Sequence, residues 1–316
     1  MKKCSIPDIP FSQTSNQIEP IDEKGEVYIS NVEYLKMKNI ELKKNDIINI
    51  GDIHSFIETQ KYLELIVENS CSIQKGESII ITPNGILNSK KKRRNNSNEV
   101  LFGYFSDLSA YYDIDYELPP NPLIKNNNFE NNISSRDNDK NEGIFFLIYY
   151  NFKFQNYFIK DYENGYGTFI KINNSYKLKD NSLINIGDSF LIFTFSNENT
   201  KNQNQNETLC LKAYSGNTTY EPKIFEQTLN KEYTIGRNEK DDVVLQDKML
   251  SRIHCIVFYD EKGWFIKDGN QFGEPSTNGT WIFAYDEFEI YDDMIFKSNA
   301  NLFSCHLRNN NNKNEI

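Results

Sequence analysis

The sequence predicts an all-β protein built from sheets packed on sheets. Short runs of β-branched and aromatic residues, such as SIIIT, IFFLIYY and CIVFY, recur between clusters of Gly, Asn and Asp, a pattern typical of β-sandwiches. No long stretch carries the i, i+3, i+4, i+7 apolar spacing of an amphipathic helix. The 22 Phe and 19 Tyr residues also favour strands over helices.

Internal repeats indicate more than one sandwich. Residues 157–172 (YFIKDYENGYGTFIKI) align with residues 264–283 (WFIKDGNQFGEPSTNGTWIF), because both carry FIKD, a glycine-containing loop and then Gly-Thr. Residues 41–52 (ELKKNDIINIGD) align with residues 177–188 (KLKDNSLINIGD) in the same way. We therefore expect two sandwiches and an incomplete third copy.

The repeats and the polar runs between them predict the domain boundaries. We expect the chain to begin with a tail that is mobile and to end with a short polar tail. In chain order, the expected parts are a tail (1–24), the last strands of a partial repeat (25–60), a divergent sandwich (61–196), a linker (197–208), a second sandwich (209–309) and a tail (310–316).

Composition excludes several classes of site. The formal net charge of −10 argues against nucleic-acid binding, because such a surface needs a basic stripe that displaces counterions. The five cysteines are scattered without a CxxC pair, so neither a disulfide framework nor a zinc site is predicted. His54 and His306 have no Cys, Asp or Glu partner at ligand spacing. We predict no metal site and no cofactor.

The expected location is intracellular and cytoplasmic. No segment approaches the roughly 18 consecutive apolar residues of a membrane span, and the N-terminus has no signal-peptide core. Membrane binding is therefore not expected. The basic run KKKRR at residues 90–94 is either a solvated loop or a nuclear-import signal.

Five short motifs follow one another between strand-like runs in the C-terminal part. They are Gly236-Arg237, Asp241-Asp242-Val243, Leu250-Ser251-Arg252-Ile253-His254, Asp268 and Ser276-Thr277-Asn278-Gly279-Thr280. In this order they resemble the forkhead-associated (FHA) domain, and the resemblance covers residues 209–307. It extends in degraded form to residues 61–196. The resemblance implies tandem FHA-type β-sandwiches (SMAD/FHA-like), with an N-terminal partial repeat and loops that bind a phosphothreonine peptide.

The resemblance also assigns roles to individual residues. Arg237 and Ser251 would bind the phosphate, with Arg252 as a third contributor. Thr277 would contact the phosphate or the threonine methyl group, and Asn278 would hydrogen-bond the peptide backbone. Three further residues would shape or brace the loops: Gly236, His254 and Gly279.

The chemistry of these side chains suits a phosphate. A planar guanidinium can donate to two phosphate oxygens at once, and hydroxyl and backbone N–H groups can supply further donors. Each hydrogen bond to a charged group contributes about 1.5 to 3 kcal/mol. Two or three such bonds would decide between a phosphorylated and an unmodified threonine. The partner expected is therefore a protein containing phosphothreonine.

The C-terminal part departs from the family pattern at three places. Residues 269–275 (GNQFGEP) form a longer loop than the family usually has, which is expected to reshape the peptide groove. Residues 281–284 (WIFA) replace the common Val-Asn-Gly, and Asp292-Asp293 replaces the late Gly-Asp. These departures bear on specificity more than on phosphate binding.

The middle sandwich has lost the pattern of a phosphate site. Tyr104 stands where the arginine after glycine should be, and Ser135-Arg136 is not followed by a histidine. The loop around Asn164-Gly165 lacks Ser-x-Asn-Gly. We predict that this sandwich has a structural role or mediates self-association.

The predicted function is a phosphothreonine-binding adaptor without catalysis. The alternative is a scaffold whose sandwiches mediate assembly that does not depend on phosphate. An enzyme ranks third and last among the interpretations, because the sequence contains no assembled nucleophile, base or cofactor motif.

Overall fold

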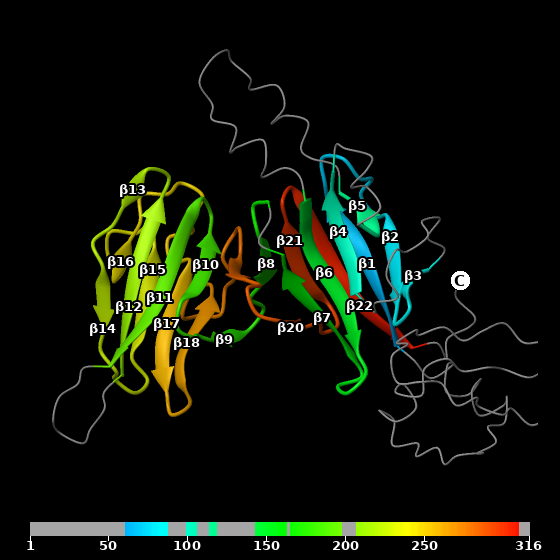
Figure 1. The fold of residues 1–316 in the computed structure, drawn as a ribbon. Coiled ribbons are helices and arrows are strands. Elements are labelled where there is room, and N and C mark those ends of the chain that lie inside the picture. The colour runs from blue at the N-terminus through cyan, green and yellow to red at the C-terminus, as the bar shows by residue number, and fades with distance from the viewer. Residues whose placement is uncertain are drawn as a thin grey trace, which may run out of the picture. The chain divides into compact units, whose positions relative to one another are not determined.

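The computed structural model describes residues 61–87, 99–105, 114–118, 143–162, 165–197 and 207–309. All regular elements in these ranges are β-strands, which confirms the predicted all-β class (Figure 1). None of the described segments forms a helix with the length and apolarity needed to cross a lipid bilayer. The expected tails, the partial repeat at 25–60 and the basic run at 90–94 lie outside the described residues.

The chain divides into two compact units. Unit 1 combines the described residues up to Gly167 with the described residues from Tyr285 onward. One of its sheets contains, in spatial order, β21 (Met294–Ser298), β22 (Asn301–Asn309), β1 (Lys61–Asn69), β2 (Ser78–Thr82) and β3 (Gly85–Ile86). Its other sheet contains β20 (Phe288–Glu289), β7 (Asn156–Asp161), β6 (Gly143–Asn151), β4 (Glu99–Tyr104) and β5 (Tyr116–Glu117).

Aromatic rings from both sheets form the core of unit 1. Phe102 and Phe146 stack with their centroids 4.5 Å apart. Phe146 also meets Phe296 edge-on at 5.3 Å, and Phe296 stacks on Phe303 at 5.0 Å. All four side chains are fully buried. The two sheets are thus held together by rings in the stacked and edge-to-face arrangements that aromatic pairs prefer.

Unit 2 consists of Thr168–Ala284. One of its sheets contains, in spatial order, β13 (Thr218–Thr219), β12 (Glu207–Ser215), β11 (Ser189–Asn197), β10 (Ser182–Ile186), β19 (Thr280–Phe283) and β8 (Thr168–Lys171), and β14 (Lys223–Phe225) also pairs with β12. The other sheet contains β16 (Val243–Val244), β15 (Glu232–Gly236), β17 (Cys255–Asp260), β18 (Gly263–Asp268) and β9 (Ser175–Lys177).

The core of unit 2 is built around Trp264, which is 1% exposed. Its ring lies 6.3 Å from Phe225 and 6.3 Å from Tyr233, and those two rings lie 4.8 Å apart. Ile235 and Phe193, each with no exposed surface, belong to the same buried set. Strands of both sheets contribute, as in a sheet-on-sheet sandwich.

The two units repeat one another strand by strand. The order β20-β7-β6-β4-β5 in unit 1 corresponds to β9-β18-β17-β15-β16 in unit 2, and the last pair is parallel in both. Backbone conformations match as well: Asn181 (φ 61°) and Asp293 (φ 60°) each precede a corresponding strand. Gly187 and Asn299, both with φ of 52°, lie in the following hairpin turns. These are residue types that tolerate positive φ.

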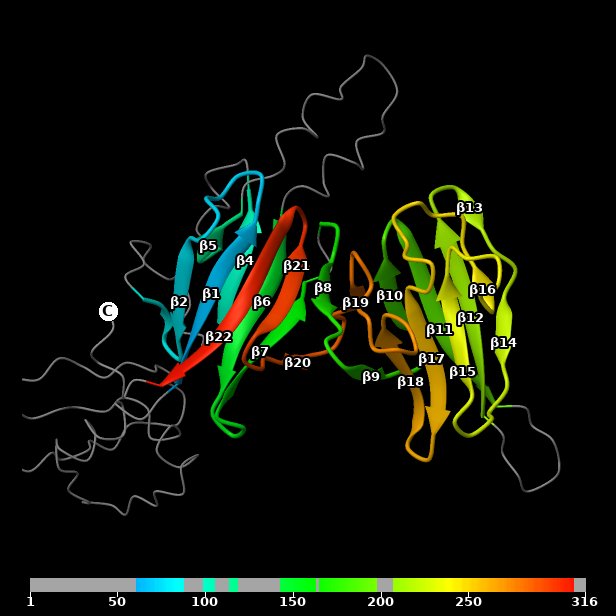
Figure 2. The ribbon, with the colours of Figure 1, turned by 180° about the vertical axis from the view of Figure 1, so that it is seen from behind.

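The division of the chain differs from the predicted boundaries at 61–196, 197–208 and 209–309. β11 pairs with β12 from Ser189↔Ser215 to Asn197↔Glu207, so both ends of the expected linker are strand. β9 pairs with β18, β20 pairs with β7, and β22 pairs with β1. Figure 2 shows β22, in red, alongside β1, in blue. β9, β10 and β11, which follow the first Gly-Thr, therefore belong to unit 2, and β20, β21 and β22, which come after the second Gly-Thr, belong to unit 1.

The repeat itself explains why sequence alone gave other boundaries. The hairpins β10–β11 and β21–β22 have similar lengths and patterns, so either one fits either copy. Pairing between β11 and β12 closes only the short connection at residues 198–206. Short closures cost less chain entropy, with each doubling of length adding about 0.6 kcal/mol.

The boundaries can be tested with two fragments. Residues 168–284 carry every strand of unit 2, so we expect this fragment to unfold cooperatively in urea. Residues 209–309 lack β9, β10 and β11, which leaves β12 without its long partner strand, and we expect no cooperative transition. Circular dichroism during urea titration makes the comparison. A cooperative transition for residues 209–309 alone would support the boundaries predicted from sequence.

Candidate functional site

Three loops of unit 2 bring the predicted phosphate-binding residues together. They follow β15, precede β17 and connect β18 to β19. A surface pocket of about 510 Å³ between them is lined by Arg237, Ser251, Arg252 and Thr277 among other residues. Four of the five side chains predicted to bind the phosphopeptide thus share one concavity. The fifth, Asn278, lies outside its lining.

Arg237 is exposed and held in place from one side. Its Nε donates a hydrogen bond to the Leu250 carbonyl (2.8 Å), and its backbone N–H donates to the Ser251 carbonyl (3.2 Å). The two terminal guanidinium nitrogens make no hydrogen bond or ion pair with the part of the chain that the structure describes. The fork of donors is therefore oriented but unoccupied, as a bidentate phosphate contact requires.

The hydroxyls of Ser251 and Thr277 meet across two loops. Their oxygen atoms lie 3.3 Å apart, and the backbone N–H of Thr277 donates to Ser251 Oγ at 3.0 Å. Arg252 is exposed beside them, and its side chain makes no hydrogen bond within the described ranges. The pocket therefore carries two cationic groups and two hydroxyls beside one carboxylate, Glu274, and neither arginine forms an ion pair with a described residue.

The side-chain amide of Asn278 already makes a hydrogen bond within the protein. Its Nδ2 donates to the Met249 carbonyl at 2.7 Å, and its own carbonyl accepts a hydrogen bond from Trp281 Nε1 at 2.9 Å. The side chain is exposed and joins the loop before β17 to the loop before β19. Asn278 thus fastens the rim of the site, and its expected hydrogen bond to a peptide stays a prediction.

Gly236 permits a close approach that no other residue allows. A Cβ at this position would lie 2.1 Å from the Arg252 carbonyl oxygen and 2.7 Å from Asp241 Oδ2. The end of β15 can therefore pass directly beneath the loop that carries Ser251 and Arg252. Gly279 has a different reason to be glycine, because its φ of 77° lies in the left-handed region.

His254 braces the loops from within the core. The ring is fully buried, its Nδ1 accepts the Ser251 N–H (3.2 Å), and its Nε2 donates to the Gly279 carbonyl (3.0 Å). Burial lowers the pKa of His254 below its ordinary value, although the hydrogen bond to Gly279 and the charges of Asp268 and Asp247 oppose the shift. The neutral ring with hydrogen on Nε2 fits both contacts.

Asp268 organises the loop that contains Thr277. Its Oδ1 accepts hydrogen bonds from Ser276 Oγ (2.7 Å) and Thr280 Oγ1 (2.6 Å), and its Oδ2 accepts the Ser276 N–H (3.0 Å). Ser276 Oγ in turn accepts the Gly279 N–H at 2.9 Å. This network fixes the Ser-Thr-Asn-Gly-Thr turn before any ligand is present.

Asp247 is a supporting residue that the sequence did not reveal. It is 6% exposed, and its Oδ2 accepts the Asp188 N–H (2.9 Å) and the Ser189 hydroxyl (2.7 Å). Its Oδ1 accepts the Met249 N–H at 2.8 Å. One carboxylate thereby fastens the β10–β11 turn to the rim of the site. No local motif marks it, because Asp188 and Ser189 lie far away in the chain.

The corresponding place in unit 1 keeps the backbone but not the arginine. A Cβ on Gly103 would lie 2.2 Å from the Gly143 carbonyl oxygen, which matches the close approach at Gly236. The next residue is Tyr104, which is half-buried. Ser135 and Arg136 lie outside the described residues.

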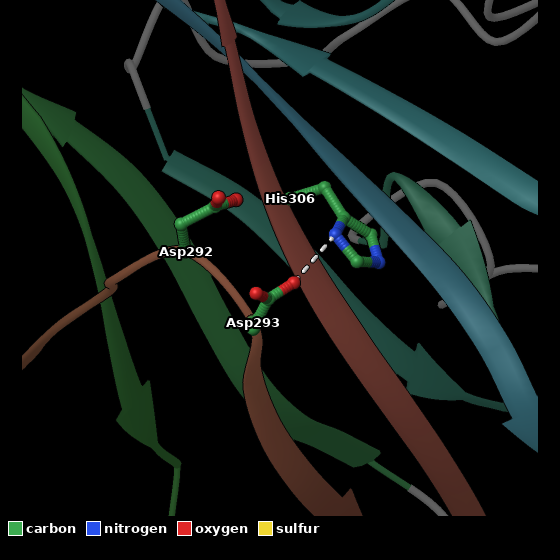
Figure 3. Close-up of side chains that lie close together, drawn as sticks. All are labelled: Asp292, Asp293 and His306. Atoms are coloured by element: carbon green, nitrogen blue, oxygen red, sulfur yellow. Dashed lines mark ion pairs between the residues drawn. The ribbon is translucent and has the colours of Figure 1, made fainter.

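An acidic pair and a histidine cluster in unit 1, contrary to the expectation that His306 has no such neighbours (Figure 3). His306 Nδ1 lies 3.2 Å from Asp293 Oδ1, and Asp292 Oδ1 accepts the Leu307 N–H at 2.9 Å. Pairing between β21 and β22 brings them together, which the sequence spacing does not show. We assign these contacts to the stability of that hairpin.

Because Asp247 accepts three hydrogen bonds, we expect that replacing it with asparagine destabilises the fold. Asp247→Asn keeps the shape but removes one of two acceptor oxygens that three donors use. We expect the free energy of unfolding to fall by about 2 kcal/mol, measured by urea denaturation. The exposed neighbour change Asp188→Asn should cost about 0.5 kcal/mol or less. Equal costs for the two variants would contradict the role given to Asp247.

The lowered pKa of His254 predicts a pH dependence of stability. Below the ordinary histidine pKa of about 6.5 the unfolded chain takes up a proton that the folded ring resists. The stabilisation is therefore complete above that value and declines as pH falls. We expect the stability advantage of wild type over His254→Gln, measured in urea, to narrow between about pH 7.5 and about pH 5.5. An unchanged advantage would contradict a neutral ring.

Comparison with known proteins agrees with the resemblance seen in the sequence. Residues 233–290 match the family model of the FHA domain. No curated protein matches the chain.

Similar solved structures are themselves FHA domains. The FHA-1 domain of Rv1747 from Mycobacterium tuberculosis is 16% identical, with 28% of this chain and 87% of that chain covered and a TM-score of 0.16. A structure from work on phosphothreonine-dependent FHA domain interactions is 17% identical (27% and 85% covered, TM-score 0.14). The FhaA FHA domain in complex with the intracellular domain of Rv3910 is 15% identical (27% and 88% covered, TM-score 0.14).

The family match includes all five residues that the motif series singled out for phosphopeptide binding, Arg237, Ser251, Arg252, Thr277 and Asn278. The chain carries an FHA domain.

Proposed function

We propose that the protein is a non-catalytic adaptor that binds phosphothreonine-containing proteins through the loops of unit 2. One observation carries the proposal. The Arg237 guanidinium is exposed, oriented by the Leu250 carbonyl, and lines the same pocket as Ser251, Arg252 and Thr277. If Arg237 were buried in an ion pair, a scaffold would be favoured. Arg237 forms no ion pair with any described residue.

The groups in the pocket account for dependence on phosphate. A phosphate carries close to two negative charges and three acceptor oxygens. Arg237 and Arg252 supply the opposite charge, and the Ser251 and Thr277 hydroxyls supply further donors. Two or three charge-assisted hydrogen bonds of about 1.5 to 3 kcal/mol each would supply much of the roughly 8 kcal/mol that a micromolar complex needs.

The buried histidine supports binding over catalysis. His254 is fully buried, and both ring nitrogens are engaged by Ser251 and Gly279 of the protein itself. A general base must reach the proton it removes from a substrate. His254 therefore acts on the site through the loops that it holds.

A scaffold that assembles without phosphate is the second candidate, and a feature of unit 1 favours it. This unit has Tyr104 in the place of the arginine, and its exposed aromatic side chains include Phe154 (60%), Tyr162 (46%) and Tyr166 (51%). Exposed rings are common at protein interfaces. Self-association through unit 1 is compatible with either candidate.

Calorimetry with phosphothreonine peptides tests the proposed function. We expect wild type to bind a subset of a phosphothreonine peptide library with micromolar affinity and to ignore the unmodified peptides. Arg237→Ala should weaken binding by at least about 100-fold, because it removes two charge-assisted hydrogen bonds.

A matched arginine serves as the control. Arg308 lies on unit 1, where it pairs with Glu64 at 3.3 Å, so Arg308→Ala should leave peptide affinity unchanged. Two outcomes would favour the scaffold. In one, Arg237→Ala binds the peptides as tightly as wild type does. In the other, the protein binds no peptide and its self-association is unaffected by phosphatase.

A further inference from the structure

The loop between β18 and β19 holds an aromatic ring in solvent beside the candidate site. Phe272 is 80% exposed, the highest value among the large hydrophobic side chains of the described residues. Single exposed rings are ordinary on protein surfaces. Two features distinguish Phe272 from such rings: it lines the pocket of the candidate site, and hydrogen bonds fix its loop.

Hydrogen bonds within the loop fix the backbone around Phe272. Asn270 Oδ1 accepts the N–H groups of Phe272 (3.0 Å) and Glu274 (3.1 Å), and Asn270 Nδ2 donates to Glu274 Oε2 (2.7 Å). A Cβ on Gly269 would lie 2.0 Å from the Glu274 carbonyl oxygen, so the loop closes against glycine. A ring presented by a rigid loop loses little conformational freedom when a ligand covers it.

Phe272 lines the same pocket as the groups proposed to bind phosphate. Arg237, Ser251, Arg252 and Thr277 form one part of the lining, and residues of the long loop form another part: Asn270, Phe272, Glu274 and Pro275. A peptide whose phosphothreonine occupies the first part therefore carries its neighbouring side chains past the second. The occupant of the Phe272 surface is thus part of the same peptide.

We infer that the loop at residues 269–275 forms a specificity subsite, in which the Phe272 ring packs against an apolar side chain flanking the phosphothreonine. This inference rests on the proposed function. The phosphate contacts are indifferent to the flanking sequence, whereas a ring in water gains from contact with an aliphatic or aromatic side chain. Partial burial of the ring is expected to favour such a peptide by about tenfold.

A phosphothreonine peptide library tests the subsite, with one flanking position varied at a time and the full chain as the binding protein. We expect one flanking position at which Leu, Ile, Met or Phe is preferred by about tenfold over Gly or Asp. Phe272→Ala should abolish that preference while retaining dependence on the phosphate. Phe272→Leu, which keeps an apolar surface, should retain most of it.

The controls separate this inference from the proposed function. Phe154→Ala removes an exposed ring from unit 1 and should leave the preference unchanged. Phosphate-dependent binding with the same flanking preference in wild type and Phe272→Ala would overturn the subsite alone. Absence of phosphate-dependent binding in wild type would overturn both proposals.

Discussion

The pairing of β11 with β12 is the constraint on which the arrangement of both units depends. These strands run side by side from Ser189↔Ser215 to Asn197↔Glu207, although they lie on either side of a polar connection. Once β11 belongs to the sheet of β12, the hairpin β10–β11 completes unit 2. The first strand of unit 1, β1, then pairs with β22 instead. A local pairing across a short connection thereby determines which hairpin closes which core.

The β10–β11 hairpin is connected to the loops of the candidate site through a single carboxylate, that of Asp247. Asp247 accepts hydrogen bonds from the turn at Asp188 and Ser189 and also from Met249, which lies in the same loop as Ser251. The rim of the pocket is therefore supported by a hairpin that precedes the FHA match at residues 233–290 in the chain. A site defined by its motifs alone omits the part of the fold that holds it.

Much of the architecture was predictable because it depends on local patterns. Short β-branched and aromatic runs predicted the all-β class, and the ordered motifs around Arg237 and Ser251 identified residues that the structure brings into one pocket. The boundaries were not predictable, because both hairpins satisfy the same pattern. Asp247 and His306 have partners that only the pairing of distant strands supplies. Asn278 has the expected place in the sequence, but its amide group is engaged with Met249.

The two units separate what the fold requires from what phosphate binding requires. Gly103 and Gly236 both permit a neighbouring carbonyl to approach within the space of a Cβ, so the close packing of strand and loop survives in each copy. The residue after the glycine is under no such steric demand, and it is Tyr104 in one unit and Arg237 in the other. A sandwich can therefore lack an arginine at this position without losing its packing. The fold therefore does not require Arg237 at this position, and its guanidinium, exposed and oriented by the Leu250 carbonyl, agrees with the proposed phosphorylated ligand.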